Sequence, residues 1–369
     1  MNSKGKVLVA MSGGIDSSMA ALLLHEQGYE VIGITMKTWD YASAGGSKKE
    51  TGCCSLDSIN DARSISVTYG FPHLVLDLRE EFGESIINNF VDEYLAGRTP
   101  NPCVLCNTYI KWDALLRRAD QLNCEFIATG HYARTRYENE RYILSKGLDN
   151  TKDQSYVLWG LSQESLKRTI FPLANLTKKE VRKIAVEKGF SDLANKSESY
   201  EICFIPDNDY RNFLRRKIND MPNLNLKSNF EGDFVLADGT TIGKHKGYPF
   251  YTIGQRKGLE IAVGEPLYVT KINPDTNTVT LGSAEDVKGQ KMQVKKINLI
   301  KYDRLPDNFQ SVTRIRHKDS GKMSTANQID GNTVEIFFHD KVSAIAPGQS
   351  AVFYEGEDVV GGGIIEKAL

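Results

Sequence analysis

The chain has 369 residues, of which 40% are hydrophobic, and a formal net charge of −1; this is enough length for two or three domains and too little charge to attract nucleic acid over the whole surface. Any contact with RNA must therefore come from local basic patches. Because no apolar leader opens the chain and no apolar stretch could span a bilayer, we expect a soluble cytoplasmic protein with no membrane partner, and six cysteines are too sparse for a secreted disulfide scaffold.

Short apolar runs alternate with segments of helical periodicity along the first third of the chain. Strands are predicted at residues 7–10, 31–36, 74–78 and 126–129, and helices at residues 17–27, 56–69, 80–96 and 109–122. This alternation predicts an α/β fold, a parallel sheet with helices on both faces. Ligands of such sheets bind outside the carboxyl ends of the strands, so the loop after the first strand, Met36 and Gly130-His131 are expected to share one cleft.

Residues 11–18, with the sequence MSGGIDSS, link the first predicted strand to the first predicted helix. Two glycines let successive backbone N–H groups point outward, and the helix adds its unpaired N–H groups and the positive end of its dipole. Turn chemistry alone also places glycine and serine here, but the flanking strand and helix favour a site for a pyrophosphate-sized anion. Neither a Walker A lysine nor a GxGxxG fingerprint is present. The loop resembles the PP-loop of ATP pyrophosphatases, which cut ATP between its α and β phosphates and adenylate a substrate oxygen.

After the alternating strands and helices, the sequence predicts a hairpin, one further helix and then mainly short strands. Residues 134–146 predict a hairpin with Asn139 at its tip, and Thr177 with Glu180 predicts a capping box at the start of a helix. Beyond about Pro206, glycine-rich turns and short β-type runs predict an antiparallel barrel toward the C-terminus.

Three cysteines stand in two further segments. Cys103 and Cys106 belong to RTPNPCVLCN at residues 98–107, and Cys106 is expected at or near the start of a helix, where a thiol pKa falls. Cys203, in EICFI, has the apolar neighbours of an inert core cysteine. The C-x-x-C pair alone is consistent with a redox dithiol, half a metal site or coincidence. An adenylating loop upstream favours a catalytic role of these cysteines in sulfur chemistry over coincidence.

Eight segments occur in order across nearly the whole chain: SGGIDSS, Met36, RTPNPCVLCN, ATGHYAR, KDQSY, EICFI, YTIGQRKGL and PGQSAVFYEGEDVVGGGIIE. In this the chain resembles the family of tRNA-specific 2-thiouridylases. The resemblance implies 2-thiolation of the wobble uridine, U34, in the tRNAs for lysine, glutamate and glutamine. It also implies a PP-loop catalytic domain at residues 1–206, a small central domain at 207–280 and a C-terminal β-barrel at 281–369.

The resemblance assigns roles residue by residue. Cys106 takes the position of the nucleophile and Cys203 that of the persulfide carrier, while Asn101, Pro102 and Cys103 surround the target base. The positions that contact ATP are Ala10, Met11, Ser12, Gly13, Gly14, Ile15, Asp16, Ser17, Met36 and Gly130. The positions that contact tRNA are His131, Lys152, Asp153, Gln154, Arg316, His317 and Gln349.

The residue types agree with this chemistry. Uridine O2 is a poor leaving group, so ATP first converts it into an adenylated ester, with Asp16 placed to help position Mg²⁺. Sulfur supplied by a cysteine desulfurase or a relay protein, and carried as a persulfide on Cys203, then attacks C2 and AMP leaves. Cys106 attacks the persulfide to release the sulfur, and a reductant resets the resulting disulfide. Trp112 is a candidate for stacking on the base.

Cys103 departs from the family's commoner pattern, which has an acid-base aspartate there. A thiol is a poorer proton shuttle at neutral pH than a tuned carboxylate. Cys103, Cys106 and Cys203 are therefore also candidates to hold a [4Fe-4S] cluster that carries sulfide. Two rival functions stay open: a PP-loop ligase that adenylates a small carboxylate for amidation, and a tRNA-binding protein without catalysis.

Residues 288–304 contain few acids and many cations. Such a run is either a solvated face or, on a tRNA-binding barrel, a set of phosphate contacts. The cations are Lys288, Lys291, Lys295, Lys296, Lys301 and Arg304.

Overall fold

The computed structural model describes residues 3–39, 55–196, 202–205, 207–221, 231–261 and 264–369. The chain forms two compact units, each assembled from separate stretches of sequence. The first unit contains Met1–Ile86, Cys103–Asn208 and Glu357–Val360, and the second contains Ile87–Pro102, Asp209–Gly356 and Gly361–Leu369. Neither unit is therefore one continuous segment of the sequence.

The first unit is built on a five-stranded parallel sheet in the order β3-β2-β1-β4-β7. Its strands are β1 (Lys6–Ala10), β2 (Glu30–Lys37), β3 (His73–Asp77), β4 (Phe126–Ala128) and β7 (Thr169–Ile170). Val7, Leu8 and Val9 of the central strand are fully buried, as a strand covered on both faces requires. The predicted α/β fold is confirmed.

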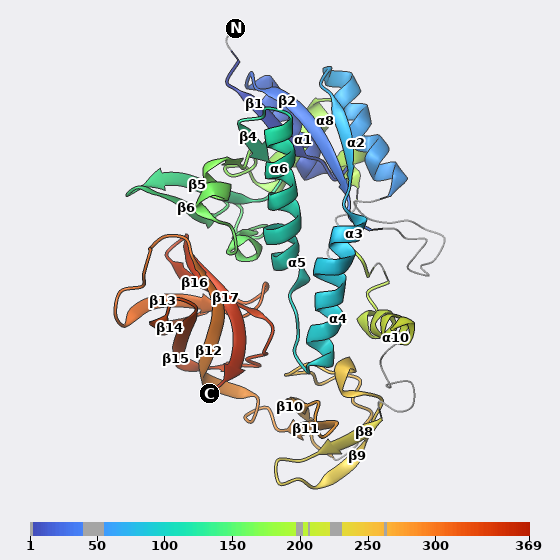
Figure 1. Ribbon diagram of the computed structural model, residues 1–369, viewed down its shortest axis with the longest axis vertical. Helices are drawn as coiled ribbons and strands as arrows, with labels where there is room; N and C mark the ends of the chain where they lie inside the picture. The colour runs from blue at the N-terminus through green and yellow to red at the C-terminus, as the bar shows by residue number, and fades with distance from the viewer. Residues whose placement is uncertain (1–2, 40–54, 197–201, 206, 222–230, 262–263) are drawn as a thin grey trace. The chain divides into compact units, whose positions relative to one another are not determined.

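Helices cover this sheet. Figure 1 shows α1 and α8 behind the sheet and α6 in front of it. The predicted capping box is present at the start of α8, where Thr177 and Glu180 exchange side-chain and backbone hydrogen bonds. The helices are α1 (Ile15–Glu26), α2 (Leu56–Tyr69), α6 (Asp113–Gln121), α7 (Gln163–Lys167), α8 (Lys178–Glu187), α9 (Ser191–Asn195) and the short 3₁₀ turn η4 (Ser155–Leu158).

Two helical runs contain π-helical turns. The helix predicted over residues 80–96 is present as α3 (Arg79–Phe82), η2 (Gly83–Ile87) and α4 (Asn88–Leu95). The helix predicted from residue 109 begins earlier, with α5 (Pro102–Leu105) followed by η3 (Cys106–Trp112) and then α6. Proline suits a first helical position because its missing N–H is one of those left unpaired there. Cys103 therefore lies in the first turn and Cys106 in the second, so Cys106 is near the start of this helical run, as predicted.

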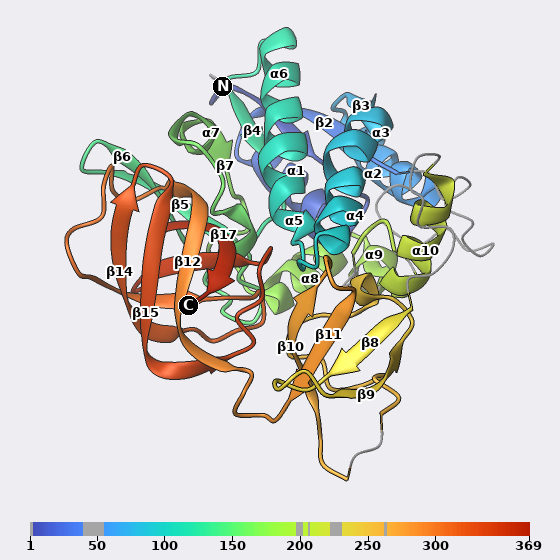
Figure 2. The same ribbon diagram turned by 60° about the horizontal axis from the view of Figure 1, so that its bottom comes forward.

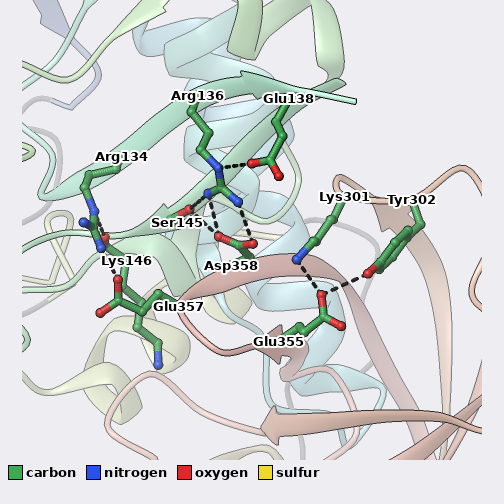
Figure 3. Close-up of polar contacts among 10 residues, drawn as sticks. All are labelled: Arg134, Arg136, Glu138, Ser145, Lys146, Lys301, Tyr302, Glu355, Glu357 and Asp358. Atoms are coloured by element: carbon green, nitrogen blue, oxygen red, sulfur yellow. Dashed lines mark hydrogen bonds and ion pairs between the residues drawn. The ribbon is translucent and has the colours of Figure 1, made fainter. Parts of the chain in front are cut away.

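The predicted hairpin is confirmed as β5 (Ala133–Glu138) and β6 (Arg141–Lys146). β6 pairs with the first residues of β17 (Asp358–Ala368), through Asp358↔Ser145 and Val359↔Leu144. Asp358 accepts two hydrogen bonds from the Arg136 guanidinium, at 2.7 and 2.9 Å, and one from the Ser145 hydroxyl at 2.7 Å (Figure 3). A late segment of the chain is thus fixed to the first unit.

The second unit contains helix α10 (Tyr210–Asp220) and a four-stranded sheet in the order β10-β11-β8-β9. It also contains a six-stranded antiparallel barrel, closed by the pairing of β12 with β17, so the predicted C-terminal barrel is confirmed (Figure 2). Within the ranges described, no helix is both long and apolar enough to cross a membrane. The strands and the 3₁₀ turn are β8 (Gly232–Val235), β9 (Thr241–His245), η6 (Tyr248–Phe250), β10 (Tyr268–Asn273), β11 (Thr278–Gly282), β12 (Lys288–Leu299), β13 (Phe309–Arg314), β14 (Lys322–Asp330), β15 (Thr333–Ser343) and β16 (Ser350–Glu355).

Candidate nucleotide and thiol site

The loop between β1 and α1 folds back onto the first turn of the helix. Ser12 N donates to Ser17 Oγ at 3.0 Å, and Ser17 Oγ donates to the Gly14 carbonyl at 3.1 Å. The Met11 N–H donates to the Ile34 carbonyl of β2 at 2.8 Å. These bonds fix the backbone between Met11 and the helix, as an anion site made of N–H groups requires.

Two glycines are required by close approaches at this loop. Gly13 has a φ of +69°, and a Cβ there would lie 2.0 Å from the Ser58 carbonyl oxygen. A Cβ on Gly130 would lie 2.7 Å from both Asp16 C and Ser17 N. The structure thus brings Gly130, from the end of β4, against the start of α1, as the sequence predicted.

Asp16 is held by a lysine that the sequence did not single out. Lys178 Nζ lies 2.7 and 2.6 Å from its two carboxylate oxygens, and the Tyr132 hydroxyl donates to Oδ1 at 2.8 Å. Lys178 is only 6% exposed. Its backbone N–H also donates to Asp149 at 2.9 Å. Because Lys178 neutralises the Asp16 carboxylate, Asp16 does not fit the expected role of a Mg²⁺ ligand.

A second lysine approaches the loop. Lys196 Nζ donates to Asp61 at 2.7 Å and to the Gly13 carbonyl oxygen at 3.5 Å. Both side chains are partly exposed, at 38% and 44%. An ammonium beside an anion loop, held by a carboxylate that can be exchanged, is suited to phosphate binding.

Two residues of the first unit that are expected to contact tRNA, Gln154 and Asp153, are held by hydrogen bonds. Gln154 and Tyr132 exchange hydrogen bonds, N to O at 3.0 Å and N to Oε1 at 3.1 Å, so Gln154 is linked through Tyr132 to Asp16. Asp153 accepts from Ser155 N at 3.0 Å and thereby shapes the turn that also carries Lys152.

The surroundings of His131 favour the uncharged form of its imidazole. The surrounding protein, and to a lesser degree Lys111, lowers the pKa of His131 to about 3, so its imidazole is uncharged at neutral pH. Its Nδ1 lies 2.8 Å from Thr129 Oγ1. Trp112, whose ring centroid lies 5.5 Å from that of His131, is fully buried. The suggestion that Trp112 stacks on a base is therefore wrong.

Cys106 and Cys203 both belong to the first unit. Cys106 is 8% exposed, whereas Cys203 is exposed beside the buried Phe204. The Phe204 ring lies 6.2 Å from that of Trp39 and 5.7 Å from that of Phe82, so the apolar neighbour anchors the segment and leaves the thiol accessible. The core setting expected for Cys203 from its neighbours alone is wrong.

The three candidate cluster ligands do not form one ligand set. Among the described residues, no three His, Cys, Asp or Glu side chains converge as a metal site, and Cys106 and Cys203 are not joined in a disulfide. Cys103 reaches solvent, yet the surrounding protein raises the pKa of its thiol, with Lys111 acting in the opposite direction. The described residues therefore do not fit an iron–sulfur cluster.

Most of the remaining expected site residues lie in the second unit. Gln349 Nε2 donates to the carbonyl oxygens of Thr99 and Pro100 at 3.0 and 3.1 Å, and so fixes the backbone just before Asn101 and Pro102. Arg316 and His317 are exposed on the barrel. Met36, in the first unit, is half-buried near the end of β2.

Three family models match consecutive parts of the chain: the tRNA methyl transferase HUP domain at residues 5–207, the tRNA methyl transferase PRC-barrel domain at 223–283 and the aminomethyltransferase β-barrel domain at 289–365. Among similar proteins, that of Amoebophilus asiaticus is 63% identical over 368 residues, covering 99% of this chain and 96% of its own length. That of Cytophaga hutchinsonii is 62% identical over 371 residues, covering 100% and 99%, and that of Salinibacter ruber is 56% identical over 370 residues, covering 100% and 96%. All three are named tRNA-specific 2-thiouridylase MnmA.

Proposed function

Because this chain belongs to the family of tRNA-specific 2-thiouridylases, we propose that it replaces O2 of the wobble uridine of tRNA with sulfur in an ATP-dependent reaction. One observation supports this proposal most directly: an anion loop of PP-loop type and two cysteines, one buried and one exposed, belong to the same compact unit. The amidating ligase has no use for these thiols. The tRNAs for lysine, glutamate and glutamine are the proposed substrates.

In the activation step, uridine O2 attacks the α-phosphorus of ATP and pyrophosphate leaves. The N–H groups of the loop and the first turn of α1 bind the departing pyrophosphate. Lys196, in a partly exposed pair with Asp61, supplies positive charge beside the loop, and Lys178 holds Asp16 at the first turn of α1.

In the transfer step, the terminal sulfur of a persulfide on Cys203 attacks C2 of the uridine, and AMP departs with O2. The Cys106 thiolate then attacks Cys203 Sγ and breaks the S–S bond. The bonding electrons stay with the sulfur now attached to C2, and Cys106 and Cys203 become a disulfide. A dithiol reductant restores both thiols. The exposure of Cys203 suits a residue that must accept sulfur from a cysteine desulfurase or a relay protein.

The test is thiolation in vitro with ATP, a sulfur donor and a tRNA bearing the target uridine, followed by mass spectrometry of the nucleosides. We expect 2-thiouridine at the wobble position from the native protein and none from Cys106→Ser or Cys203→Ser. Cys124→Ala is the matched control, because Cys124 is a buried cysteine with no assigned role. A methylated uridine, which the names of two family models suggest, or an unchanged tRNA would contradict the proposal.

The iron–sulfur alternative is decided by the same assay under anaerobic conditions with iron and sulfide analysis. Full activity of iron-free protein is the expected result. Activity that requires bound iron would show that the thiols rearrange into a ligand set.

A further inference from the structure

One motif has no role in the chemistry above: YTIGQRKGL at residues 251–259. Its two cations, Arg256 and Lys257, are exposed. Helix α10 carries Arg211, Arg215, Arg216 and Lys217 in the same unit. We name these six residues the α10 cationic surface.

Contacts join the helix and the motif into one surface. Arg211 Nε donates to the Phe250 carbonyl oxygen at 3.0 Å, and its guanidinium lies 5.7 Å from the Tyr251 ring centroid. A Cβ on Gly258 would lie 3.3 Å from Arg211 Nη1, so the helix lies against the segment that carries Arg256 and Lys257. These contacts hold Arg211 against the segment that carries Arg256 and Lys257.

In the part of the chain that the structure describes, no ion pair balances the charge of this surface. None of the ion pairs found in the described ranges includes any of the six residues. The neighbouring acids have other partners, because Asp209 caps α10 and Glu260 binds Lys246 at 2.8 Å. In contrast, four cations of the basic run at residues 288–304 are paired with carboxylates: Lys288 with Glu285, Lys291 with Glu335, Lys295 with Glu366 and Lys301 with Glu355.

Two aromatic rings that face guanidinium groups of this surface are covered. The Arg215 guanidinium lies 4.7 Å from the Phe250 ring centroid, and Phe250 and Tyr251 are only 4% and 6% exposed. These rings orient the guanidinium groups and are not available for stacking on bases. Guanidinium forks held in this way fit phosphate oxygens, and they read no base sequence.

We propose that the α10 cationic surface binds the phosphate backbone of tRNA without regard to its sequence. This inference rests on the proposed function for its substrate, but not on the thiolation chemistry. The sequence suggested the basic run at residues 288–304 as a set of phosphate contacts. We assign the main phosphate contact to α10 and the YTIGQRKGL motif instead. Each phosphate neutralised releases counterions, so the affinity for tRNA must depend on salt through these residues.

The test compares two triple variants of the full chain. Arg215→Gln with Arg256→Gln and Lys257→Gln removes three unpaired cations and leaves the Arg211 contacts intact. Lys288→Gln with Lys291→Gln and Lys295→Gln removes the same number of paired cations. Affinity is measured over a series of salt concentrations with a substrate tRNA and with a tRNA that lacks the target uridine.

We expect the first variant to lower the slope of log K against log salt by about 2 to 3 in magnitude, since each duplex phosphate contact contributes about 0.9. The loss must be equal for both tRNAs. The second variant is expected to keep the native slope, and thermal unfolding of both variants verifies that they fold. An unchanged slope in the first variant, a loss confined to the substrate tRNA, or an equal loss in the second variant overturns the inference. If the native protein thiolates tRNA but the first variant keeps the native slope, only the role of the α10 cationic surface is contradicted. If the slope falls but the native protein does not thiolate tRNA, only the proposed thiolation reaction is contradicted.

Discussion

Lys178 Nζ lies 2.6 Å from Asp16 Oδ2, which joins the first residue of α8 to the first turn of α1 across 162 positions of sequence. The lysine side chain is 8% exposed and the aspartate side chain 33%. Removing one partner of such a pair leaves a poorly solvated charge, so the pair is expected to stabilise the fold.

Lys178→Met is expected to lower the free energy of unfolding by about 1 to 3 kcal/mol, less than for a fully buried pair because Asp16 remains partly solvated. It is also expected to abolish ATP binding. The double variant Lys178→Met with Asp16→Asn removes both charges and should recover most of the stability without recovering ATP binding. Urea denaturation and calorimetric titration measure the two effects. If the double variant recovers both stability and ATP binding, Lys178 has only a structural role.

Lys196 and Asp61 predict effects of opposite sign on pyrophosphate binding. Lys196→Gln removes an ammonium beside the loop and should weaken pyrophosphate binding about two- to fivefold, the range of a partly exposed ion pair. Asp61→Asn removes the carboxylate that competes for the ammonium and should strengthen binding by a similar factor. Lys188→Gln, which breaks an exposed pair with Glu26, is the control. A shift in the same direction for both variants would refute the role of Lys196.

Gly13 and Gly14 are adjacent but differ in what a methyl group would meet. Gly13→Ala places a Cβ 2.0 Å from the Ser58 carbonyl at a φ of +69° and is expected to cost about 1 to 3 kcal/mol of unfolding free energy. Gly14→Ala meets nothing nearer than Ser12 Oγ at 3.5 Å and should stay within about 0.5 kcal/mol of the native value. Thermal denaturation of the two variants compares them directly, and equal destabilisation would contradict the packing described for Gly13.

His131 predicts a pH dependence of stability. Its folded-state pKa of about 3 lies below the ordinary value of 6.5, so the unfolded chain binds the proton first as the pH falls. The stability due to neutral His131 is complete above pH 6.5 and is lost progressively between pH 6.5 and 3. His131→Gln should therefore flatten the fall in unfolding free energy between pH 6.5 and 5 by about 1 kcal/mol per pH unit. His339→Gln, at an exposed site, serves as the control; an unchanged slope in His131→Gln would contradict the assignment.

The strand, loop and helix around Gly13 were predictable because each signal is local: an apolar run, two glycines and an apolar helix. The start of the helix that carries Cys106 was not, since Pro102 breaks helices in general and is favourable only in the first helical position. The ion pairs of Asp16 with Lys178 and of Asp61 with Lys196 join residues 162 and 135 positions apart. No local pattern marks such a partner, so the charges beside the loop required the fold.

The hydrogen bonds of Asp358 to Arg136 and Ser145 have a consequence for synthesis on the ribosome. The first unit consists mainly of Met1–Ile86 and Cys103–Asn208, yet it also includes Glu357–Val360 from a much later part of the chain. Domains generally fold in order as they emerge, but here the hairpin β5–β6 must wait for almost the whole chain before its partner strand arrives. A nascent chain that stalls before Glu357 therefore carries an incomplete first unit. Synthesis of Glu357–Val360, rather than of Cys103–Asn208, is the step that completes this unit.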